Sequence, residues 1–211
     1  MTDLPLLQAD KLTCERDDRV LFDGLSFAAR AGEVWQLAGP NGSGKTTLMR
    51  IIAGLHGDFS GHVDWPAARS AGQDPRQQLL TIGHRPGLRV ELTALENLRW
   101  WLALHQCVLD VAQAEQALSR VGLAGYETVP VAQMSAGQTR RVALSMLWLV
   151  NKSVWLLDEP FTALDVDGVA LIEARLRELA DAGALVLYSS HHRVNGDARQ
   201  IRLGDGRGEV R

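Results

Sequence analysis

The chain has 211 residues, a hydrophobic fraction of 46% and a formal net charge of −3 at pH 7. This length fits one large domain, or one domain with a subdomain, and the composition is that of an ordinary globular protein. The slight acidic excess disfavours a general nucleic-acid binder. The two cysteines, Cys14 and Cys107, predict neither a disulfide framework nor a zinc site.

Membrane insertion is also disfavoured by the sequence. Residues 1–5 carry no charged and then apolar segment of the kind that directs secretion. The longest apolar run, at residues 142–150, is far shorter than the roughly 20 residues that cross a bilayer. We therefore expect a soluble chain whose association with a membrane depends on a partner protein.

The predicted strands are short apolar runs bounded by polar or glycine-containing turns. They lie at residues 25–29, 34–38, 61–65, 79–83, 154–157 and 184–188. The first two are expected to form a hairpin through the turn at residues 30–33, and the polar residues 70–78 to form a loop. The run at 154–157 is apolar throughout, as in a strand covered on both faces.

The predicted helices follow apolar residues that recur at helical spacing. They lie at residues 47–54, in two stretches between 92 and 121, at 136–150 and at 167–180. The change of period between residues 92 and 121 predicts a helical subdomain inserted between strands. The last helix lies between two buried strands, which is a β-α-β pattern.

Residues 39–47 match the phosphate-binding loop pattern G-x-x-x-x-G-K-[ST]. A strand leads in and a helical pattern leads out, so a chance match in a glycine-rich turn is the weaker interpretation. The glycines let backbone N–H groups point inward around a triphosphate, and the helix N-terminus adds its positive dipole end. Lys45 is predicted to reach the β- and γ-phosphates, and Thr46 to ligate Mg²⁺. The residues predicted to hold the nucleotide are Gly39, Pro40, Asn41, Gly42, Ser43, Gly44, Lys45, Thr46 and Thr47.

Two adjacent carboxylates, Asp158 and Glu159, follow the apolar run that begins at residue 154. A carboxylate at a strand end beside a phosphate loop can hold Mg²⁺ through water, which is the predicted role of Asp158. Glu159, just beyond the strand, is placed to polarise a water against the γ-phosphate. Acidic residues also occur at strand ends without a catalytic role, but the phosphate loop favours the catalytic interpretation.

A third segment reads Met-Ser-Ala-Gly-Gln at residues 134–138. With the phosphate loop and the acidic pair, it resembles the ATP-binding cassette family, whose signature runs Leu-Ser-Gly-Gly-Gln. The resemblance implies that Ser135, Gly137 and Gln138 contact the γ-phosphate bound to a second chain, while Ala136 stands where glycine is usual. The alternative is an N-cap serine that begins an ordinary helix, and the two are compatible because capping and phosphate binding use the same N–H groups.

Two further segments follow in the family's order. Asp165 is implied to be the D-loop residue, which lines the interface between paired cassettes. His191 is implied to be the switch histidine that hydrogen-bonds the γ-phosphate and keeps Glu159 and the water in register. His192 is the competing candidate. A haem or metal role for the histidine pair is disfavoured, because adjacent residues of a strand point to opposite faces.

The chain departs from the family at two positions. Arg85 stands where a glutamine senses Mg²⁺, and a guanidinium cannot ligate a metal. Its alternatives are a contact with the γ-phosphate, a contact with a partner carboxylate, or exposure to solvent. Arg16 stands where an aromatic residue stacks on adenine. A guanidinium can also stack on a base, so binding is retained while selectivity for adenine is loose. We expect measurable ATPase activity that is slow without a partner.

Within that family the chain is more similar to the ATP-binding subunits of bacterial cytochrome c maturation systems. The resemblance rests on residues 14–17, 24–27, 83–87, 91–98, 135–138 and 158–169. It implies a homodimer of cassettes that binds integral membrane subunits at the cytoplasmic face of the inner membrane, without nucleic acid. ATP hydrolysis, with Mg²⁺, would drive the release of a haem-loaded chaperone. Whether haem itself is moved stays open.

The resemblance also implies the fold, an α/β P-loop NTPase of the ABC-cassette type. Its mixed β core would carry an antiparallel β subdomain and an inserted α-helical subdomain, all within one nucleotide-binding domain at residues 1–211. The core and β subdomain are expected at residues 1–84 and 152–211, the helical subdomain at about 86–134, and the signature helix at 135–150. One of Trp100 and Trp101 would line a groove for the membrane subunit; alternatively, both are partly buried in the subdomain.

Three other functions are weighed against this one. Another small ABC transporter would share the same motifs. Soluble cassettes in DNA repair, chromosome maintenance or translation usually carry coiled-coil or zinc insertions, or two cassettes in one chain, and the sequence has none of these. A small-molecule kinase would not explain residues 135–138 or His191. Transport is therefore the favoured function.

Overall fold

The computed structural model describes residues 4–192, 194 and 198–210. They divide into two compact units. Unit 1 is built from the described residues within the ranges 1–81, 152–159 and 176–211, and unit 2 from residues 82–151 and 160–175. Each unit is therefore assembled from segments that lie far apart in the sequence.

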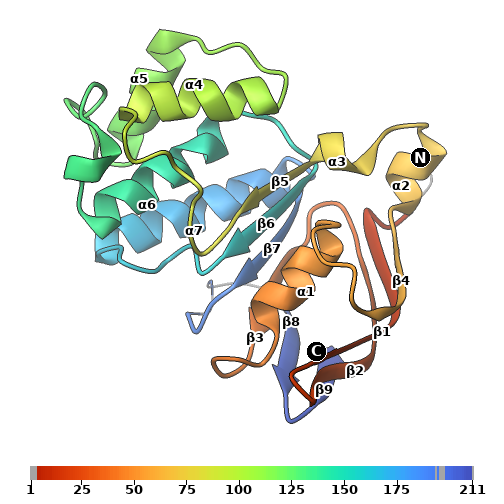
Figure 1. The fold of residues 1–211 in the computed structure, drawn as a ribbon. Helices are drawn as coiled ribbons and strands as arrows, with labels where there is room; N and C mark the ends of the chain where they lie inside the picture. Colours follow the sequence, from red (N-terminus) through yellow and green to blue (C-terminus); the bar gives the residue numbers. More distant parts are fainter. Residues whose placement is uncertain (1–3, 193, 195–197, 211) are drawn as a thin grey trace. The chain divides into compact units, whose positions relative to one another are not determined.

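The larger sheet has the strand order β5-β6-β7-β3-β8-β9 (Figure 1). Its strands are β3 (Val34–Ala38), β5 (Leu79–Ile82), β6 (Val154–Asp158), β7 (Leu185–Ser189), β8 (Arg199–Gly204) and β9 (Arg207–Val210). β3 pairs in parallel with β7 and β8, β6 pairs in parallel with β7, and β8 and β9 are antiparallel. Every residue of β6 and β7 is buried, as expected for inner strands of a parallel sheet.

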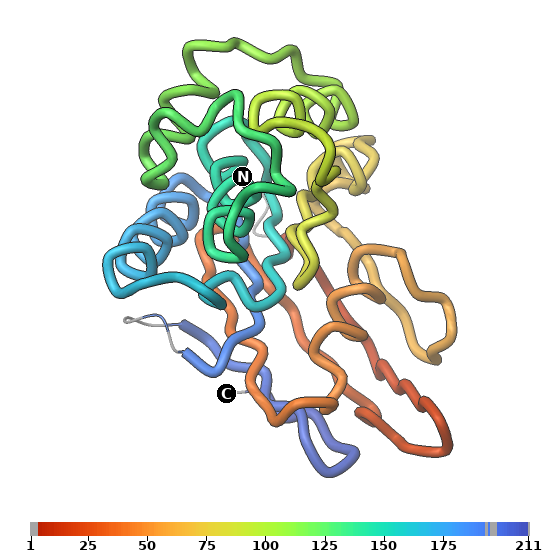
Figure 2. Tube along the Cα trace, turned by 60° about the vertical axis from the view of Figure 1, so that its left-hand side comes forward, coloured from red at the N-terminus to blue at the C-terminus, as the bar shows by residue number. Residues whose placement is uncertain are grey.

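A smaller antiparallel sheet has the order β2-β1-β4. It contains β1 (Leu7–Arg16), β2 (Arg19–Ala29) and β4 (Ser60–Asp64). In Figure 2 the β1–β2 hairpin is drawn in red, and β2 also contacts the blue strand β9. The predicted hairpin between residues 25–29 and 34–38 is therefore wrong. Residues 25–29 alternate between buried and exposed positions and pair with β1, whereas 34–38 enter the other sheet.

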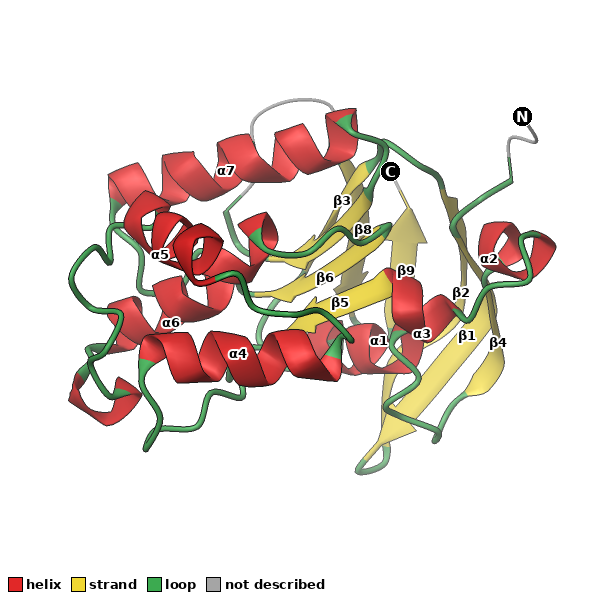
Figure 3. Cartoon of the chain, turned by 90° about the horizontal axis from the view of Figure 1, so that it is seen from above, coloured by secondary structure: helices red, strands yellow, loops and turns green. Residues whose placement is uncertain are grey.

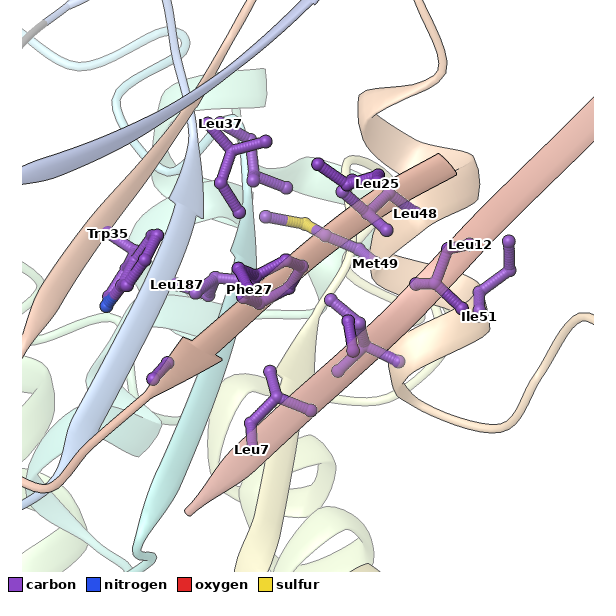
Figure 4. Close-up of a cluster of buried hydrophobic side chains, with 14 of the residues drawn as sticks. Leu7, Leu12, Leu25, Phe27, Trp35, Leu37, Leu48, Met49, Ile51 and Leu187 are labelled. Atoms are coloured by element: carbon purple, nitrogen blue, oxygen red, sulfur yellow. The ribbon is translucent and has the colours of Figure 1, made fainter. Parts of the chain in front are cut away.

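Helix α1 (Lys45–Ile52) and the two sheets of unit 1 share one hydrophobic core (Figure 4). The helix buries an apolar face at helical spacing, while alternate residues of β1 and β2 point toward it. Members of this core are Leu7, Leu12, Leu25, Phe27, Trp35, Leu37, Leu48, Met49, Ile51 and Leu187. This packing fixes the N-terminus of α1, which follows the phosphate-binding loop.

The segment between β4 and β5 contains two short helices, α2 (Pro66–Ser70) and α3 (Pro75–Gln78). The prediction of a loop throughout residues 70–78 is therefore wrong. Asp74 caps α3 by accepting a hydrogen bond of 2.9 Å from the backbone N–H of Arg76, and Pro75 occupies the first turn. Both residues favour a helix N-terminus, and this local signal outweighs the polar composition.

Unit 2 is helical, and Figure 3 shows its helices in red. It contains α4 (Ala94–Leu104), α5 (Val111–Arg120), the single turn η1 (Val131–Gln133), α6 (Ala136–Leu144) and the first part of α7 (Val166–Asp181). The two helices predicted between residues 92 and 121 are confirmed as α4 and α5. In the described part of the chain, no helix has both the length and the apolar composition needed to span a membrane.

The helix predicted at residues 136–150 is wrong beyond Leu144. There α6 ends and the chain continues as the 3₁₀ helix η2 (Ser145–Trp148). The Ser145 hydroxyl donates a hydrogen bond of 2.7 Å to the carbonyl of Val142, three residues earlier. Such a bond from a serine to a preceding carbonyl competes with regular helix, and a tighter 3₁₀ turn is common at a helix end.

Candidate active site

Residues 39–44 form a loop between the end of β3 and the start of α1. Gly44, the residue before α1, has a φ of 97°, which is accessible mainly to glycine, and it supplies no side-chain cap. A Cβ at Gly39 would collide with the backbone carbonyl of Leu203. Because Gly44 has no side chain, it offers no acceptor to the first N–H groups of α1. Such N–H groups at a helix N-terminus form an anion-binding site.

Two side chains of this loop bear on whether a phosphate fits it. Lys45 Nζ donates hydrogen bonds of 2.8 and 3.0 Å to the carbonyls of Gly39 and Pro40, so its ammonium lies within the loop. The Ser43 hydroxyl is buried, with 4% of the residue exposed, and makes no hydrogen bond to any described residue. Buried hydroxyls usually have a partner, and a phosphate oxygen would supply one.

Thr46 and Ser189 both hold the carboxylate of Asp158 at the end of β6. The Thr46 hydroxyl donates a hydrogen bond of 2.8 Å to Asp158 Oδ2, and the Ser189 hydroxyl donates one of 2.6 Å to Oδ1. The two residues predicted to hold Mg²⁺, Thr46 and Asp158, are therefore in direct contact in unit 1. A hydroxyl and a carboxylate are oxygen ligands of the kind that Mg²⁺ prefers.

Ser189 is a site residue to which the sequence analysis gave no role. It ends β7, opposite Asp158 in register, and it is fully buried. Its hydroxyl also accepts a hydrogen bond of 2.9 Å from the backbone N–H of Glu159. The available signal was a hydroxyl directly after a predicted apolar strand, the same place relative to a strand that Asp158 and Glu159 occupy.

The backbone of Glu159 adopts a left-handed conformation with a φ of 51°. This region is uncommon for residues other than glycine, asparagine and aspartate, and Pro160 restricts the preceding residue further. Strained backbone of this kind costs on the order of 1–3 kcal/mol and clusters at functional sites. The strain fits the predicted catalytic role of Glu159, which is half-buried.

His191 lies at the phosphate-binding loop. Its Nε2 is 3.3 Å from Oδ1 of Asn41, one of the predicted nucleotide-binding residues. His192 is held through its backbone instead, by the Ser190 hydroxyl and the side chain of Gln36. The geometry favours His191 as the residue that faces a phosphate. Both histidines follow the end of β7, so the argument against a metal role that placed them within a strand was wrong.

The predicted signature segment forms the start of α6 in unit 2. Ser135 and Gln138 make a reciprocal capping box, with hydrogen bonds of 3.2 and 2.9 Å between each side chain and the other's backbone N–H. Ala136 is exposed, whereas a Cβ at Gly137 would lie 2.6 Å from the carbonyl oxygen of Ala163. Alanine is therefore compatible with the first glycine position of the family's signature, and only glycine with the second.

Asp165, the predicted D-loop residue, is bound within its own unit. Its Oδ1 accepts hydrogen bonds of 2.6 Å from Arg141 Nη2 and 2.8 Å from the backbone N–H of Gly168. Arg141 belongs to α6, so the predicted D-loop residue is bound to the helix that begins with the predicted signature segment. The sequence analysis assigned no role to Arg141.

The two family departures, Arg16 and Arg85, are both exposed. Arg16 ends β1 and forms an ion pair with Asp17, in which Nε and Oδ2 are 3.4 Å apart. Arg85 belongs to the segment that joins β5 to α4. In the single chain Arg85 faces solvent, as its third alternative expects. Its contact with the γ-phosphate or with a partner carboxylate stays a prediction, as does base stacking by Arg16.

Asn97 organises the segment that follows Arg85. It is fully buried in α4, and its Oδ1 accepts a hydrogen bond of 2.8 Å from the Arg89 backbone N–H. Its Nδ2 donates to the carbonyls of Arg89, Leu92 and Thr93 at 2.9 to 3.2 Å. The guanidinium of Arg89 lies 4.8 Å from the ring centre of Trp100. Trp100 and Trp101 are both half-buried, as the second alternative for them expects.

A phosphate-binding loop after β3, a carboxylate at the end of β6 in contact with Thr46, and a capped helix that begins with the predicted signature segment match the parts of an ATP-binding cassette. The family model described as ABC transporter matches residues 22–162. The chain therefore belongs to this family, and the predicted fold class and ABC-type ATPase activity are confirmed.

The chain is similar over nearly its whole length to proteins named cytochrome c biogenesis ATP-binding export protein CcmA. It is 52% identical to the protein of Alcanivorax borkumensis, over 97% of this chain and 90% of that one. It is 49% identical to the protein of Vibrio cholerae, over 95% and 99% of the two chains. It is 46% identical to the protein of Escherichia coli K12, over 93% and 94%. The predicted resemblance to cytochrome c maturation ATP-binding subunits is confirmed.

Solved structures support the same fold. One, described as an ATP-binding subunit of an ABC transporter, matches with a TM-score of 0.81 and 25% identity. The match covers 96% of this chain and 88% of that one. A putative ABC transporter ATP-binding protein from Pyrococcus furiosus matches with a TM-score of 0.78 and 22% identity, over 93% and 96% of the two chains.

Proposed function

We propose that this chain powers a membrane complex in bacterial cytochrome c biogenesis, and that its ATP hydrolysis drives the release of a haem-loaded chaperone. The observation that carries the proposal is the 52% identity to a CcmA protein over 97% of the chain. The contact between Thr46 and Asp158 supports it, because it assembles the parts of a nucleotide site.

In this proposal the triphosphate of ATP binds to residues 39–47. Lys45 Nζ exchanges the carbonyls of Gly39 and Pro40 for the β- and γ-phosphate oxygens. The Ser43 hydroxyl then gains an acceptor. Thr46 and Asp158 would hold Mg²⁺, which when bound neutralises charge on the β- and γ-phosphates. Arg16 would lie over the base.

For hydrolysis, Glu159 orients a water molecule and accepts its proton as the water oxygen attacks the γ-phosphorus. The bond between the γ-phosphorus and the bridging oxygen breaks, so ADP leaves with that oxygen and inorganic phosphate leaves with the oxygen of water. His191 would move from Asn41 to a γ-phosphate oxygen. Ser189 fixes the backbone from which Glu159 projects.

Two chains would pair head to tail around two ATP molecules. Ser135, Gly137 and Gln138 of one chain would complete the site formed by residues 39–47 of the other. Ser135 is exposed at a helix N-terminus, and next to Asp165 the side chain of Val166 is strongly exposed, at 85%. An exposed apolar residue beside a predicted interface supports pairing of two copies. Opening after hydrolysis would deliver the mechanical step.

The membrane partner would bind at the cytoplasmic face of the inner membrane. The segment from Arg85 to Thr93 is the proposed contact, together with Trp100 and Trp101. Two hydrogen bonds support this proposal. The Asn97 side chain in α4 binds both the backbone N–H and the carbonyl of Arg89, so the conformation of the segment is fixed before a partner binds. Unit 1 is proposed as the catalytic core and unit 2 as the helical subdomain.

The test is isolation of the tagged chain from membranes of its source bacterium. We expect a multi-spanning membrane protein to co-purify, ATPase activity in the complex, and a haem absorption band in a chaperone fraction that ATP releases. Lys45→Ala is the control, which should keep the membrane partner and lose both activity and release. Recovery of the chain with DNA or ribosomes in a salt-sensitive manner, and without a membrane protein, would contradict the proposal.

A further inference from the structure

Arg141 joins three helices of unit 2. It lies in α6, six residues after Ser135, and its side chain is mostly buried. Nη1 donates a hydrogen bond of 2.7 Å to the carbonyl of Val121 at the C-terminus of α5. Nη2 pairs with Asp165 Oδ1 at 2.6 Å, just before α7. A fixed guanidinium thus binds one helix C-terminus and the residue that caps another helix.

The surroundings of the guanidinium leave room for no additional side-chain atoms. A Cβ at Gly168 would lie 2.8 Å from Asp165 Oδ1 and 3.0 Å from Arg141 Nη2. A Cβ at Gly122 would lie 2.9 Å from Arg141 Nη1. Glycine at residue 168 therefore leaves space for the ion pair, and glycine at residue 122 leaves space for the nitrogen that bonds the Val121 carbonyl.

A second contact joins the same two segments. Gly137 lies one helical turn before Arg141, on the same side of α6, and it meets the carbonyl of Ala163. Ala163 has a φ of 63°, a conformation that alanine rarely adopts. The D-loop, residues 162–165, thus meets α6 at two points, and Ala163, which lies at one of them, has a strained backbone.

We infer that Arg141 is a positioning residue that makes the signature helix and the D-loop of one chain a single rigid piece. The inference rests on the proposed paired cassettes. In that pair, the signature segment completes the partner's ATP site, while the D-loop follows the chain's own Glu159 after Pro160 and Phe161. A movement at one hydrolytic site is then passed to the signature helix that serves the other, and the two sites turn over together.

A positioning role for Arg141 predicts that loss of the ion pair lowers the rate of catalysis, whereas a stabilising role predicts that it lowers the free energy of unfolding. The side chain of Asp165 is 66% exposed. Ion pairs with an exposed member contribute little to stability, typically below about 1 kcal/mol. Removal of the pair should therefore leave the fold intact. A displacement of the signature helix of about 1 Å is enough to slow catalysis by up to about a hundredfold, so the effect belongs in the rate.

The test compares Arg141→Met and Asp165→Asn with the control Arg120→Met, which changes an exposed arginine of α5. The first readout is hydrogen exchange of residues 162–169 in the isolated chain without nucleotide. The second is the rate constant and Hill coefficient of ATP hydrolysis by the dimer. Melting temperatures establish that each variant is folded.

We expect both variants to melt within a few degrees of wild type, to exchange faster at the D-loop and to lose cooperativity, with kcat about tenfold lower. The double variant should be no worse than Arg141→Met, because once Arg141 is replaced, Asp165 has no guanidinium contact left to lose. D-loop exchange and Hill coefficient equal to wild type in Arg141→Met would overturn the inference, as would additive losses. A further outcome is that the wild-type chain neither pairs nor hydrolyses ATP, while residues 162–169 still exchange faster in Arg141→Met than in wild type. That outcome would overturn the proposed function and the coupling of the two sites. It would leave the local link between α6 and the D-loop established.

Discussion

The Ser189 hydroxyl donates a hydrogen bond of 2.6 Å to the carboxylate of Asp158, and the same oxygen accepts one of 2.9 Å from the N–H of Glu159. One side chain on β7 thereby orients the carboxylate that is predicted to hold Mg²⁺ and the backbone of Glu159, the catalytic candidate beside it. The arrangement follows from the parallel register, which places Asp158 opposite Ser189.

Ser189→Ala should lower kcat by about tenfold or more, since a buried hydrogen bond to a charged group contributes about 1.5–3 kcal/mol and 1.4 kcal/mol corresponds to a tenfold change in rate. Steady-state ATPase assays at saturating ATP measure the loss. The matched control is Ser153→Ala, which removes a hydroxyl bonded to Gln78 at the other end of the sheet. Equal rates in the two variants would contradict a role for Ser189 in the site.

Glu159→Gln should trap closed dimers loaded with ATP. The amide is nearly the same size as the carboxylate and cannot accept the proton of the attacking water, so ATP binds without being cleaved. Size-exclusion chromatography in ATP measures the dimer fraction, with Glu115→Gln on the exposed face of α5 as the control. A Glu159→Gln chain that stays monomeric in saturating ATP counts against the proposed pairing.

Gly137→Ala should impair activity far more than Ala136→Gly. The added methyl group at residue 137 would lie 2.6 Å from the carbonyl of Ala163, so the D-loop or α6 must shift. Ala136 is exposed, and its change to glycine affects the helix by less than about 1 kcal/mol. We expect kcat to fall at least about tenfold in the first variant and about twofold or less in the second. Similar rates for the two would show that the close approach is unimportant.

Arg85→Gln tests the departure at the position of the family's glutamine. An amide oxygen can contact a hydrated metal and the attacking water, whereas a guanidinium has only donors. The variant should therefore raise basal ATPase activity of the isolated dimer, by about two- to tenfold, while the wild type keeps a slow, measurable rate. Absence of turnover in the wild-type dimer and in the full assembly, with activity restored by Arg85→Gln, would mean that arginine disables the site.

Cys14 should react with thiol reagents far more slowly than Cys107. Burial, together with the nearby charge of Asp58, raises the pKa of the Cys14 thiol, so less of the reactive thiolate is present at pH 8. Cys107 is only half-buried. Ellman's reagent should label one thiol quickly, and Cys107→Ser should abolish that phase. Fast labelling of Cys14 in the folded Cys107→Ser chain would show that β1 opens readily.

Local patterns in the sequence predicted the parts of the fold that depend on neighbouring residues. The phosphate-binding loop, the apolar run of β6 and the periodicity of α4 and α5 are such cases. Local patterns do not predict which strands pair with each other, because pairing depends on the whole sheet. Residues 25–29 and 34–38 are both strands, as predicted, yet they pair in separate sheets. The short strands β8 and β9 carry exposed residues such as Arg202 and were not predicted.

The same distinction applies to the candidate site. Asp158, Glu159, Lys45 and His191 stand in recognisable motifs, so their chemistry was predicted from the sequence. Ser189 and Arg141 act through contacts with residues 20 to 31 positions away in the chain. No local pattern distinguishes such a serine or arginine from one at the surface. Their contribution emerges only when the register and the helix packing are known.

The bonds from Lys45 to the carbonyls of Gly39 and Pro40 bear on how quickly nucleotide is captured. They hold the loop in its curved conformation, so the binding site is already formed when the triphosphate arrives. The Lys45 ammonium then exchanges these two carbonyls for phosphate oxygens, without a rearrangement of the loop backbone. The rate constant for ATP association should then be close to the diffusion limit, because little conformational entropy is lost in ordering the loop.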